Sequence, residues 1–404
     1  MNMNEEIFTK ILALKRELHQ NPELSGQEYE TTQKIKEALS GLPGLTILDL
    51  GTPTGVLAQI RGTLPGPETL LRADIDALPQ TEQYDSPWQS RRHGIMHACG
   101  HDFHTAALIG AAHILSRFFL DGTLRGTVDL LFQPAEEGTT GARAVIDAGL
   151  FDAIHPNRCF GLHNWPSVDC GNIVIHEGPL MAAKRNFTLT IKGRGGHGSM
   201  PHLNVDPIVC AASVIQSLQT VISRNTNPLD SSVLSINMIK GGSPVNLVVE
   251  NVVLQGTIRS LSDDALTRAL QRAETIIYKT AEAYECGCSI EWKERIPAVI
   301  NTPEMCRLAS TAAEKTCTAL RSKAESGDFT AADPMPPACK VTDAPPSLAS
   351  EDFALYRRHV PSFFYWVGSR TPGERTEELH RPCFHTDDRA LFIAAQLYAE
   401  SARL

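Results

Sequence analysis

The sequence predicts an α/β protein in which a mixed, mostly parallel sheet is interrupted by an inserted α+β domain. Short apolar runs alternate with helical patterns in the N-terminal part of the chain and again near the C-terminus, as in parallel strands covered by helices. The stretch between them has a different order of strands and helices. We therefore expect residues 1–181 and 295–404 to build one domain and residues 182–294 to form the insert.

The composition favours a folded protein that binds small molecules. Of the 404 residues, 42% are hydrophobic and 21% are charged, close to the average of globular proteins. The 37 Lys and Arg residues against 46 Asp and Glu residues give a net charge of -9, which repels nucleic acids and anionic membrane surfaces. We expect neither as a partner.

The N-terminal sequence MNMNEEIFTK lacks the basic start and apolar core of a secretory signal, so we expect a cytoplasmic protein. The apolar stretch 106–115 is much shorter than the about 20 residues that a membrane span needs. The ten cysteines are scattered without a Cys-x-x-Cys pair, and in the cytoplasm most would be reduced packing residues.

The elements of the first domain follow from apolar spacing. Residues 5–20 are predicted to form a helix because Ile7, Ile11 and Leu18 lie on one helical stripe, which Pro22 ends. Further helices are predicted at 31–39, 105–119 and 142–148, strands at 56–60, 69–72, 128–132, 159–162 and 363–367, and a Pro- and Ser-rich loop at 333–346.

The insert shows a different pattern. We predict strands at 186–192, 232–239, 252–258 and 289–292, and helices at 207–222 and 261–283. This order, strand–helix–strand–strand–helix–strand, is typical of a ferredoxin-like α+β domain.

Polar residues follow several predicted strands directly. Asp74 and Asp76 follow the run 69–72, Glu136 and Glu137 follow the run 128–132, and His163 follows the run 159–162. In an open α/β sheet, sites form beyond the carboxyl ends of the strands. We therefore expect these side chains to converge there.

The segment 97–104 concentrates metal-binding side chains. It holds His97, Cys99, His101 and His104 within eight residues. Cys99 and His101 are two positions apart, so in an extended segment both point to one side, and Gly100 lets the backbone bend between them. A lone histidine more often caps a helix or bonds its backbone, but the density of this cluster favours a metal site.

Two adjacent carboxylates, Glu136 and Glu137, lie on a turn between Pro134 and Gly138. Neighbouring side chains diverge, so one could hold a cation while the other takes a proton from water and delivers it to a leaving amine. A solvated acidic turn is the alternative. The position directly after an apolar strand favours the site.

His163 and His380 complete the candidate donors. Alone, either is more often an ordinary hydrogen-bonded histidine than a ligand. Together with Cys99, His101 and a glutamate they supply enough donors for two neighbouring cations, as in two-metal hydrolases.

The motifs resemble those of the M20 metallopeptidase family, and more narrowly its amidohydrolase branch of aminoacylases, hippurate hydrolases and indole-acetyl-amino-acid hydrolases. The resemblance runs from the N-terminal helix to the C-terminus in the order of the family. It is carried by LRADIDALP (71–79), MHACGHDFH (96–104), LLFQPAEEG (130–138), GLHNWP (161–166), GRGGHGSMPH (193–202), SEDF (350–353) and LHRP (379–382).

The resemblance implies a catalytic domain with a centre of two divalent cations, Mn or Zn foremost and Co or Ni as alternatives. It makes Glu136 the general base and gives Asp76 a supporting role behind the site. The implied ligands are Cys99, His101, Glu137, His163 and His380.

The resemblance also implies roles for the insert as a lid and dimerisation domain. His197 would stabilise the oxyanion, within its own subunit or in the neighbouring subunit of a homodimer, and otherwise flanks a flexible turn. Asn246 and Arg259 would hold the free carboxylate of the substrate, because the planar fork of an arginine suits a carboxylate. A surface arginine at a strand end is the alternative.

Two departures from the family pattern stand near these positions. His385 follows His380 closely enough to be a second candidate for that ligand, and the residues 247–250 replace the usual turn after Asn246. The motif Leu-His-x-Pro favours His380.

The sequence thus predicts an amidohydrolase that cleaves the amide bond of N-acyl amino acids. A dipeptidase or carboxypeptidase with the same centre is the alternative. A non-catalytic protein with structural metal is less favoured, because a structural zinc site needs four ligands and this set is larger.

Overall fold

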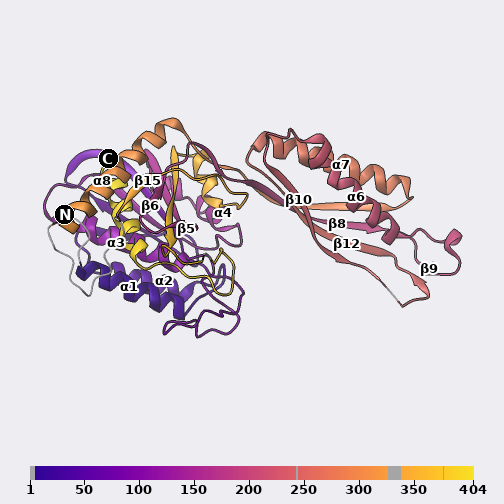
Figure 1. Ribbon diagram of the computed structural model, residues 1–404, viewed down its shortest axis with the longest axis horizontal. Coiled ribbons are helices and arrows are strands. Elements are labelled where there is room, and N and C mark those ends of the chain that lie inside the picture. Colours follow the sequence, from indigo (N-terminus) through magenta and orange to yellow (C-terminus); the bar gives the residue numbers. More distant parts are fainter. Residues whose placement is uncertain (1–4, 243, 326–337, 376) are drawn as a thin grey trace. The chain divides into compact units, whose positions relative to one another are not determined.

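The computed structural model describes residues 5–242, 244–325, 338–375 and 377–404 (Figure 1). The chain divides into two compact units, the first formed by 1–178, 300–345 and 355–404 and the second by 179–299 and 346–354. Of the loop predicted at 333–346, residues 333–337 lie outside the described residues. The remainder contains a short strand, β15 (Lys340–Thr342).

The first unit is built on an eight-stranded mixed sheet in the order β1-β2-β4-β3-β5-β16-β6-β15. Its strand β3 pairs in parallel with β4 and β5, and β5 pairs in parallel with β16. The α/β class with a mostly parallel sheet is therefore confirmed, with antiparallel pairs towards the edges. The strands are β1 (Leu45–Leu48), β2 (Val56–Arg61), β3 (Leu64–Asp74), β4 (Arg125–Gln133), β5 (Arg158–Asp169), β6 (Asn172–Val174), β15 and β16 (Ser362–Arg370).

Helices cover this sheet, and α3 lies at the centre of the core. Because α3 is apolar on nearly every face, it is buried all round rather than on one stripe. By length and composition it could cross a membrane, but 78% of its apolar window is buried inside the protein. The helices are α1 (Glu5–Gln20), α2 (Tyr29–Leu39), α3 (His101–Leu120), α4 (Gly141–Asp147), α5 (Leu150–Ala153), α8 (Pro303–Glu325) and α9 (Arg389–Ala402).

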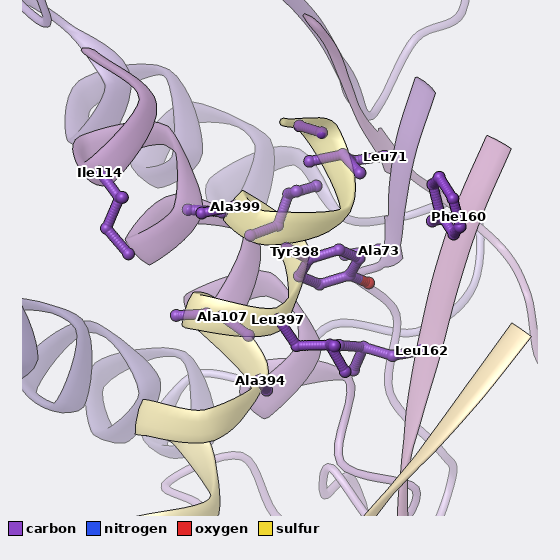
Figure 2. Close-up of a cluster of buried hydrophobic side chains, with 14 of the residues drawn as sticks. Leu71, Ala73, Ala107, Ile114, Phe160, Leu162, Ala394, Leu397, Tyr398 and Ala399 are labelled. Carbon is purple, nitrogen blue, oxygen red and sulfur yellow. The ribbon is translucent and has the colours of Figure 1, made fainter. Parts of the chain in front are cut away.

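Figure 2 shows how α9 packs in this core beside the side chains of β3 and β5. Leu71, Leu162 and Leu397 are fully buried. The hydroxyl of Tyr398 donates to the backbone oxygen of Arg72 at 2.6 Å, so the one polar atom of this ring is satisfied inside the core. Among the described cysteines, Cys317 and Cys339 form a disulfide, and eight others are free.

The second unit contains a four-stranded antiparallel sheet in the order β10-β12-β8-β13. Its strands and helices follow the predicted ferredoxin-like order. Ser262 and Asp206 cap the two helices by accepting from the backbone N–H of Ala265 and Ile208. The elements within this unit are β8 (Ala183–Lys192), β9 (Gly196–His197), η1 (Pro201–Leu203), α6 (Pro207–Asn225), β10 (Ser232–Lys240), β11 (Leu247–Val248), β12 (Asn251–Ser260), α7 (Asp263–Ala283) and β13 (Gly287–Ile296). Three short elements include residues of both units: β7 (Gly178–Met181), β14 (Val299–Asn301) and η2 (Asp352–Arg358).

Candidate metal centre

The parallel strands of the first unit bring the candidate donors to one edge of the sheet. Asp74 at the end of β3 pairs in register with Gln133 at the end of β4, so Glu136 and Glu137 follow at the same level. His163 lies within β5, which extends beyond its predicted end because β16 continues to pair with it.

Gly100 shapes the segment that carries Cys99 and His101. Its φ of 90° lies in the left-handed region, and it caps α3, whose first residue is His101. A Cβ atom at this position would lie 2.2 Å from Oδ1 of Asn164. Glycine is therefore required here by conformation and by space.

Cys99 is shared by two groups of donors. Its Sγ lies 3.4 Å from Nε2 of His163 and 3.3 Å from Nε2 of His380. In one group the ligand atoms of Cys99, His101 and His163 all lie within 4.8 Å of one another, and in the other those of Cys99, Glu137 and His380 do. The five predicted ligands therefore lie together.

His380 approaches the cluster from the loop after β16. Its backbone N–H donates to the oxygen of Ala98 at 2.8 Å, and its φ of 63° is unusual for a residue with a side chain. Its ring is 52% exposed, and Nε2 lies 3.2 Å from Oε1 of Glu137. His380 is thus the most accessible donor of the cluster.

Among the described donor atoms of this cluster, two buried ones make no well-directed hydrogen bond. They are Nε2 of His101 and Oε1 of Glu137, which lie 4.0 Å apart. Buried polar atoms are nearly always satisfied, so unpaired atoms at a cluster of donors indicate a missing partner. Imidazole, carboxylate and thiolate together suit a divalent transition metal, and the residues fit such a cation.

Asp76 supports the cluster from behind. Its Oδ1 lies 3.1 Å from Nδ1 of His101. Its Oδ2 accepts from the backbone N–H of Glu137 at 3.0 Å and from the hydroxyl of Ser25 at 2.6 Å. A single buried carboxylate therefore orients two candidate ligands.

The sequence did not predict the network of Arg72, Asp74 and His104. Asp74 accepts from Nη1 of Arg72 at 2.7 Å and bonds Nδ1 of His104 at 2.5 Å, and all three residues are fully buried. Nε2 of His104 accepts from the backbone N–H of Asn164 at 3.0 Å. Both ring nitrogens of His104 are thus occupied. The alternation of charged residues Arg72, Asp74 and Asp76 across the end of β3 was the available signal.

Burial and neighbouring charges shift the ionisation of the donors. Burial, reinforced by the charge of Glu137, raises the pKa of the Cys99 thiol well above its usual value. Burial also lowers the pKa of His163 well below its usual value, and His104 adds to the effect. Burial also acts to lower the pKa of His101, but the Asp74 carboxylate outweighs this effect, so the pKa of His101 is raised well above its usual value. Metal binding requires the deprotonated forms of these side chains.

The turn between β4 and α4 presents the two glutamates. Glu136 is 6% exposed, and its backbone oxygen accepts from Thr139 N–H at 2.6 Å. Ala135 and Thr139, on either side of the pair, have φ of 53° and 55°. The donor atoms of His101, Glu136 and Glu137 also lie within 4.8 Å of one another, so Glu136 borders the cluster.

The candidate residues of the second unit lie in two places. His197 in β9 pairs with Leu247 in β11, and the Gly198 N–H donates to the oxygen of Asn246 at 2.8 Å, so His197 and Asn246 are neighbours. Both are exposed. Arg259 lies in β12, half-buried, with Nη1 donating to the oxygen of Leu348 at 2.9 Å.

His385 and His97 lie outside the cluster. Both line a cavity of about 630 Å³. The ring of His385 stacks on Tyr84 with centroids 4.3 Å apart. His97 is buried, its two ring nitrogens have no hydrogen-bond partner, and burial lowers its pKa to about 4.

Comparisons with known proteins identify the family to which this chain belongs. A model of the peptidase family M20/M25/M40 matches residues 70–403. The chain is 39% identical over 394 residues to the N-acetyl-L-cysteine deacetylase of Bacillus subtilis (strain 168), covering 98% of this chain and 88% of that protein. It is 33% identical over 370 residues to thermostable carboxypeptidase 2 of Saccharolobus solfataricus, covering 91% of this chain and 87% of that protein.

A crystal structure of the Bacillus subtilis YXEP protein, described as a dinuclear metal-binding peptidase of the M20 family, is also similar. It matches with a TM-score of 0.79 at 36% identity, covering 99% of this chain and 98% of that chain. The chain therefore belongs to the hydrolases of peptidase family M20/M25/M40.

Proposed function

We propose that the protein hydrolyses the amide bond of small N-acyl amino acids, releasing a carboxylic acid and a free amino acid. The observation that carries the proposal is the position of Glu136 beside the cluster of Cys99, His101, Glu137, His163 and His380. An acid next to a cation site is the arrangement that amide hydrolysis needs. The similarity to a deacetylase of an N-acetylated amino acid supports this substrate class.

The five donors would hold two divalent cations, for which we propose Mn or Zn, with Co or Ni as alternatives. Such a pair, when bound, polarises the scissile carbonyl and makes an attacking water more acidic. The similarity to a dinuclear metal-binding peptidase supports two ions. Cys99 belongs to both donor groups, so its thiolate would be available to either ion.

Glu136 would act as the general base and then as the general acid. Its carboxylate takes one proton from the attacking water as the oxygen bonds to the carbonyl carbon. It then delivers this proton to the amide nitrogen, so that the carbon–nitrogen bond breaks and a free amine leaves. The low exposure of Glu136 supports this role, since water around the base is limited.

The second unit would contribute to substrate binding. We assign stabilisation of the oxyanion to His197 and binding of the substrate carboxylate to Asn246 and Arg259. Burial lowers the pKa of Arg259, but a guanidinium stays charged at neutral pH and can give a carboxylate two parallel hydrogen bonds. His197 and Asn246 are neighbours, which supports their contributing to one substrate-binding site.

We also propose a homodimer through the second unit. The segment 200–209 exposes apolar side chains, with Met200 47%, Leu203 57% and Val209 50% accessible. Adjacent apolar residues at a surface are typical of protein interfaces. Light scattering of the purified protein tests this proposal, and a monomer at micromolar concentration would contradict it.

A substrate panel tests the function. Acetyl, benzoyl and indole-acetyl amino acids are offered beside dipeptides and carboxypeptidase substrates to protein that has been stripped of metal and reloaded with Mn, Zn, Co or Ni separately. We expect turnover of at least one N-acyl amino acid. Turnover of the peptides alone would favour the carboxypeptidase alternative, which the similarity to a thermostable carboxypeptidase supports. No turnover by any reloaded form would refute both.

A further inference from the structure

We propose that Glu28 is a positioning residue whose buried carboxylate fixes the turn that carries Glu136 and Glu137. The proposal deepens the proposed function and rests on it, because that function assigns proton transfer to Glu136. Glu28 precedes its contact on the turn by 107 positions in the sequence.

The turn needs outside support because of its backbone. Ala135 and Thr139 both have φ in the left-handed region, so one such residue precedes the glutamate pair and one follows it. Residues with a Cβ atom adopt this region at a cost in free energy. Such conformations persist at functional sites where surrounding contacts hold them.

Ala135 is held on both sides. Its backbone oxygen accepts from the N–H groups of Thr140 and Gly141 at 3.4 and 3.1 Å, within the turn itself. Its N–H instead donates to Oε1 of Glu28 at 2.9 Å, outside the turn. The orientation of the peptide before Ala135 therefore depends on Glu28.

The carboxylate of Glu28 is itself firmly placed. Oε1 also accepts from the Gly26 N–H at 2.8 Å, and Oε2 accepts from the hydroxyl of Thr54 at 2.8 Å. The residue is fully buried, and burial raises its pKa while these donors oppose the shift. Because Gly26 of its own segment and residues of two distant segments, Thr54 and Ala135, all donate to this side chain, its position is fixed and it can serve as an anchor.

A second buried carboxylate holds the other end of the glutamate pair. The N–H of Glu137 donates to Oδ2 of Asp76, which also accepts from Ser25. The peptide before Ala135 is thus tied to Glu28, and the peptide after Glu136 is tied to Asp76. The short segment from Ser25 to Glu28 takes part in both connections.

The first test replaces the anchor. Glu28→Ala is expected to lower kcat about 10- to 100-fold with little change in KM, because the base is misplaced relative to the reacting atoms. Calorimetric titration of stripped protein with Zn²⁺ is expected to show about tenfold weaker binding, because Glu137 lies on the same turn. Glu28→Asp keeps the charge but shortens the side chain, and we expect the same changes at smaller size.

The second test relieves the strain. Glycine adopts a positive φ without the steric cost of a Cβ atom, so Ala135→Gly needs the anchor less. In the Glu28→Ala background, Ala135→Gly is expected to restore kcat several-fold. In the wild-type background it should leave kcat nearly unchanged. A contact that only stabilises the fold would give no such rescue.

Glu23→Ala is the matched control. Glu23 is a buried carboxylate of the same segment, but it accepts from the N–H groups of Glu30 and Thr31 at the start of α2. We expect this variant to lower the melting temperature as Glu28→Ala does, while kcat and Zn²⁺ affinity stay at wild-type values.

Three results would overturn the proposal: wild-type kcat and Zn²⁺ affinity in the Glu28 variants, an equal loss of kcat in Glu23→Ala, or no rescue by Ala135→Gly. If Glu28→Ala does not fold, Glu28→Asp and the double variant decide. If the wild-type protein hydrolyses no N-acyl amino acid, the proposed function fails. The Zn²⁺ affinity of the Glu28 variants still tests whether Glu28 positions the turn.

Discussion

Asp76 determines which nitrogen of His101 faces the other donors. Its Oδ1 lies 3.1 Å from Nδ1 of the ring, so the proton of the neutral imidazole belongs on Nδ1 and Nε2 is left as the free electron pair. Nε2 is the buried atom without a hydrogen-bond partner. The ring is thus prepared to bind a cation at that atom.

The first prediction concerns the orientation of the His101 ring by Asp76. Asp76→Ala removes the acceptor that orients His101 and the backbone of Glu137, and we expect affinity for divalent metal to fall about 10- to 100-fold. Calorimetric titration of stripped protein measures it. Ser25→Ala, which removes only a donor to Asp76, should change the affinity much less. Unchanged affinity in Asp76→Ala would contradict the supporting role.

The shared position of Cys99 leads to a prediction about metal stoichiometry. Cys99→Ala removes a donor from both groups and should weaken the binding of both ions. His380→Ala affects only the group with Glu137 and should leave one ion tightly bound. Metal content after dialysis, measured by mass spectrometry, distinguishes the two. Two tightly held ions in Cys99→Ala would show that the thiol is no ligand.

The assignment of the base predicts a selective loss of turnover. Glu136→Gln keeps the size of the side chain but cannot accept and return a proton, so kcat should fall at least about 10²- to 10⁴-fold. Metal content and melting temperature should stay close to wild type. A variant that retains wild-type turnover on the best substrate of the panel would refute the role of Glu136.

The strands and most donors could be predicted because their signals are local in the sequence. An apolar run followed directly by a carboxylate or histidine marks a strand end, and β3 and β4 were found in this way. The helix α9 was missed because it is buried on nearly every face and shows no amphipathic stripe.

Contacts between distant segments left no such signal. Asp74 could not be distinguished from an ordinary turn residue, because its partner His104 comes from α3. The N–H of Asn164, which donates to the other ring nitrogen of His104, comes from β5. Glu28 likewise contacts the turn at Ala135 only in the folded protein. Local patterns locate donors, but their supports depend on which strands and helices become neighbours.

The buried network of Arg72, Asp74 and His104 predicts a loss of folding stability that can be measured in protein stripped of metal. Asp74→Ala leaves the guanidinium of Arg72 buried without the carboxylate that it contacts at 2.7 Å, and such a change costs about 3 to 5 kcal/mol. Denaturant unfolding measures it. Glu6→Ala, which breaks the exposed pair with Lys10, should have little effect. Equal stability of both variants would contradict the network.

A last prediction follows from His19, which lies between the carboxylates of Asp102 and Glu82. Its Nδ1 is 2.9 Å from Asp102 and its Nε2 is 3.1 Å from Glu82. Burial opposes protonation of the ring, but the Asp102 and Glu82 carboxylates outweigh it and raise the pKa of His19 to about 9. The folded state therefore holds a proton that the unfolded chain releases near pH 6.5.

Because the folded pKa is the higher one, the stabilisation is fully present below about pH 6.5 and is lost as the pH rises towards 9. The difference in unfolding free energy between wild type and His19→Asn should thus shrink, on the order of 3 kcal/mol, from pH 6 to pH 9.5. Urea unfolding at these two pH values measures it. A difference that stays constant would mean that His19 is not protonated in the folded protein, and that the cluster of Asp102, His19 and Glu82 is held by neutral hydrogen bonds alone.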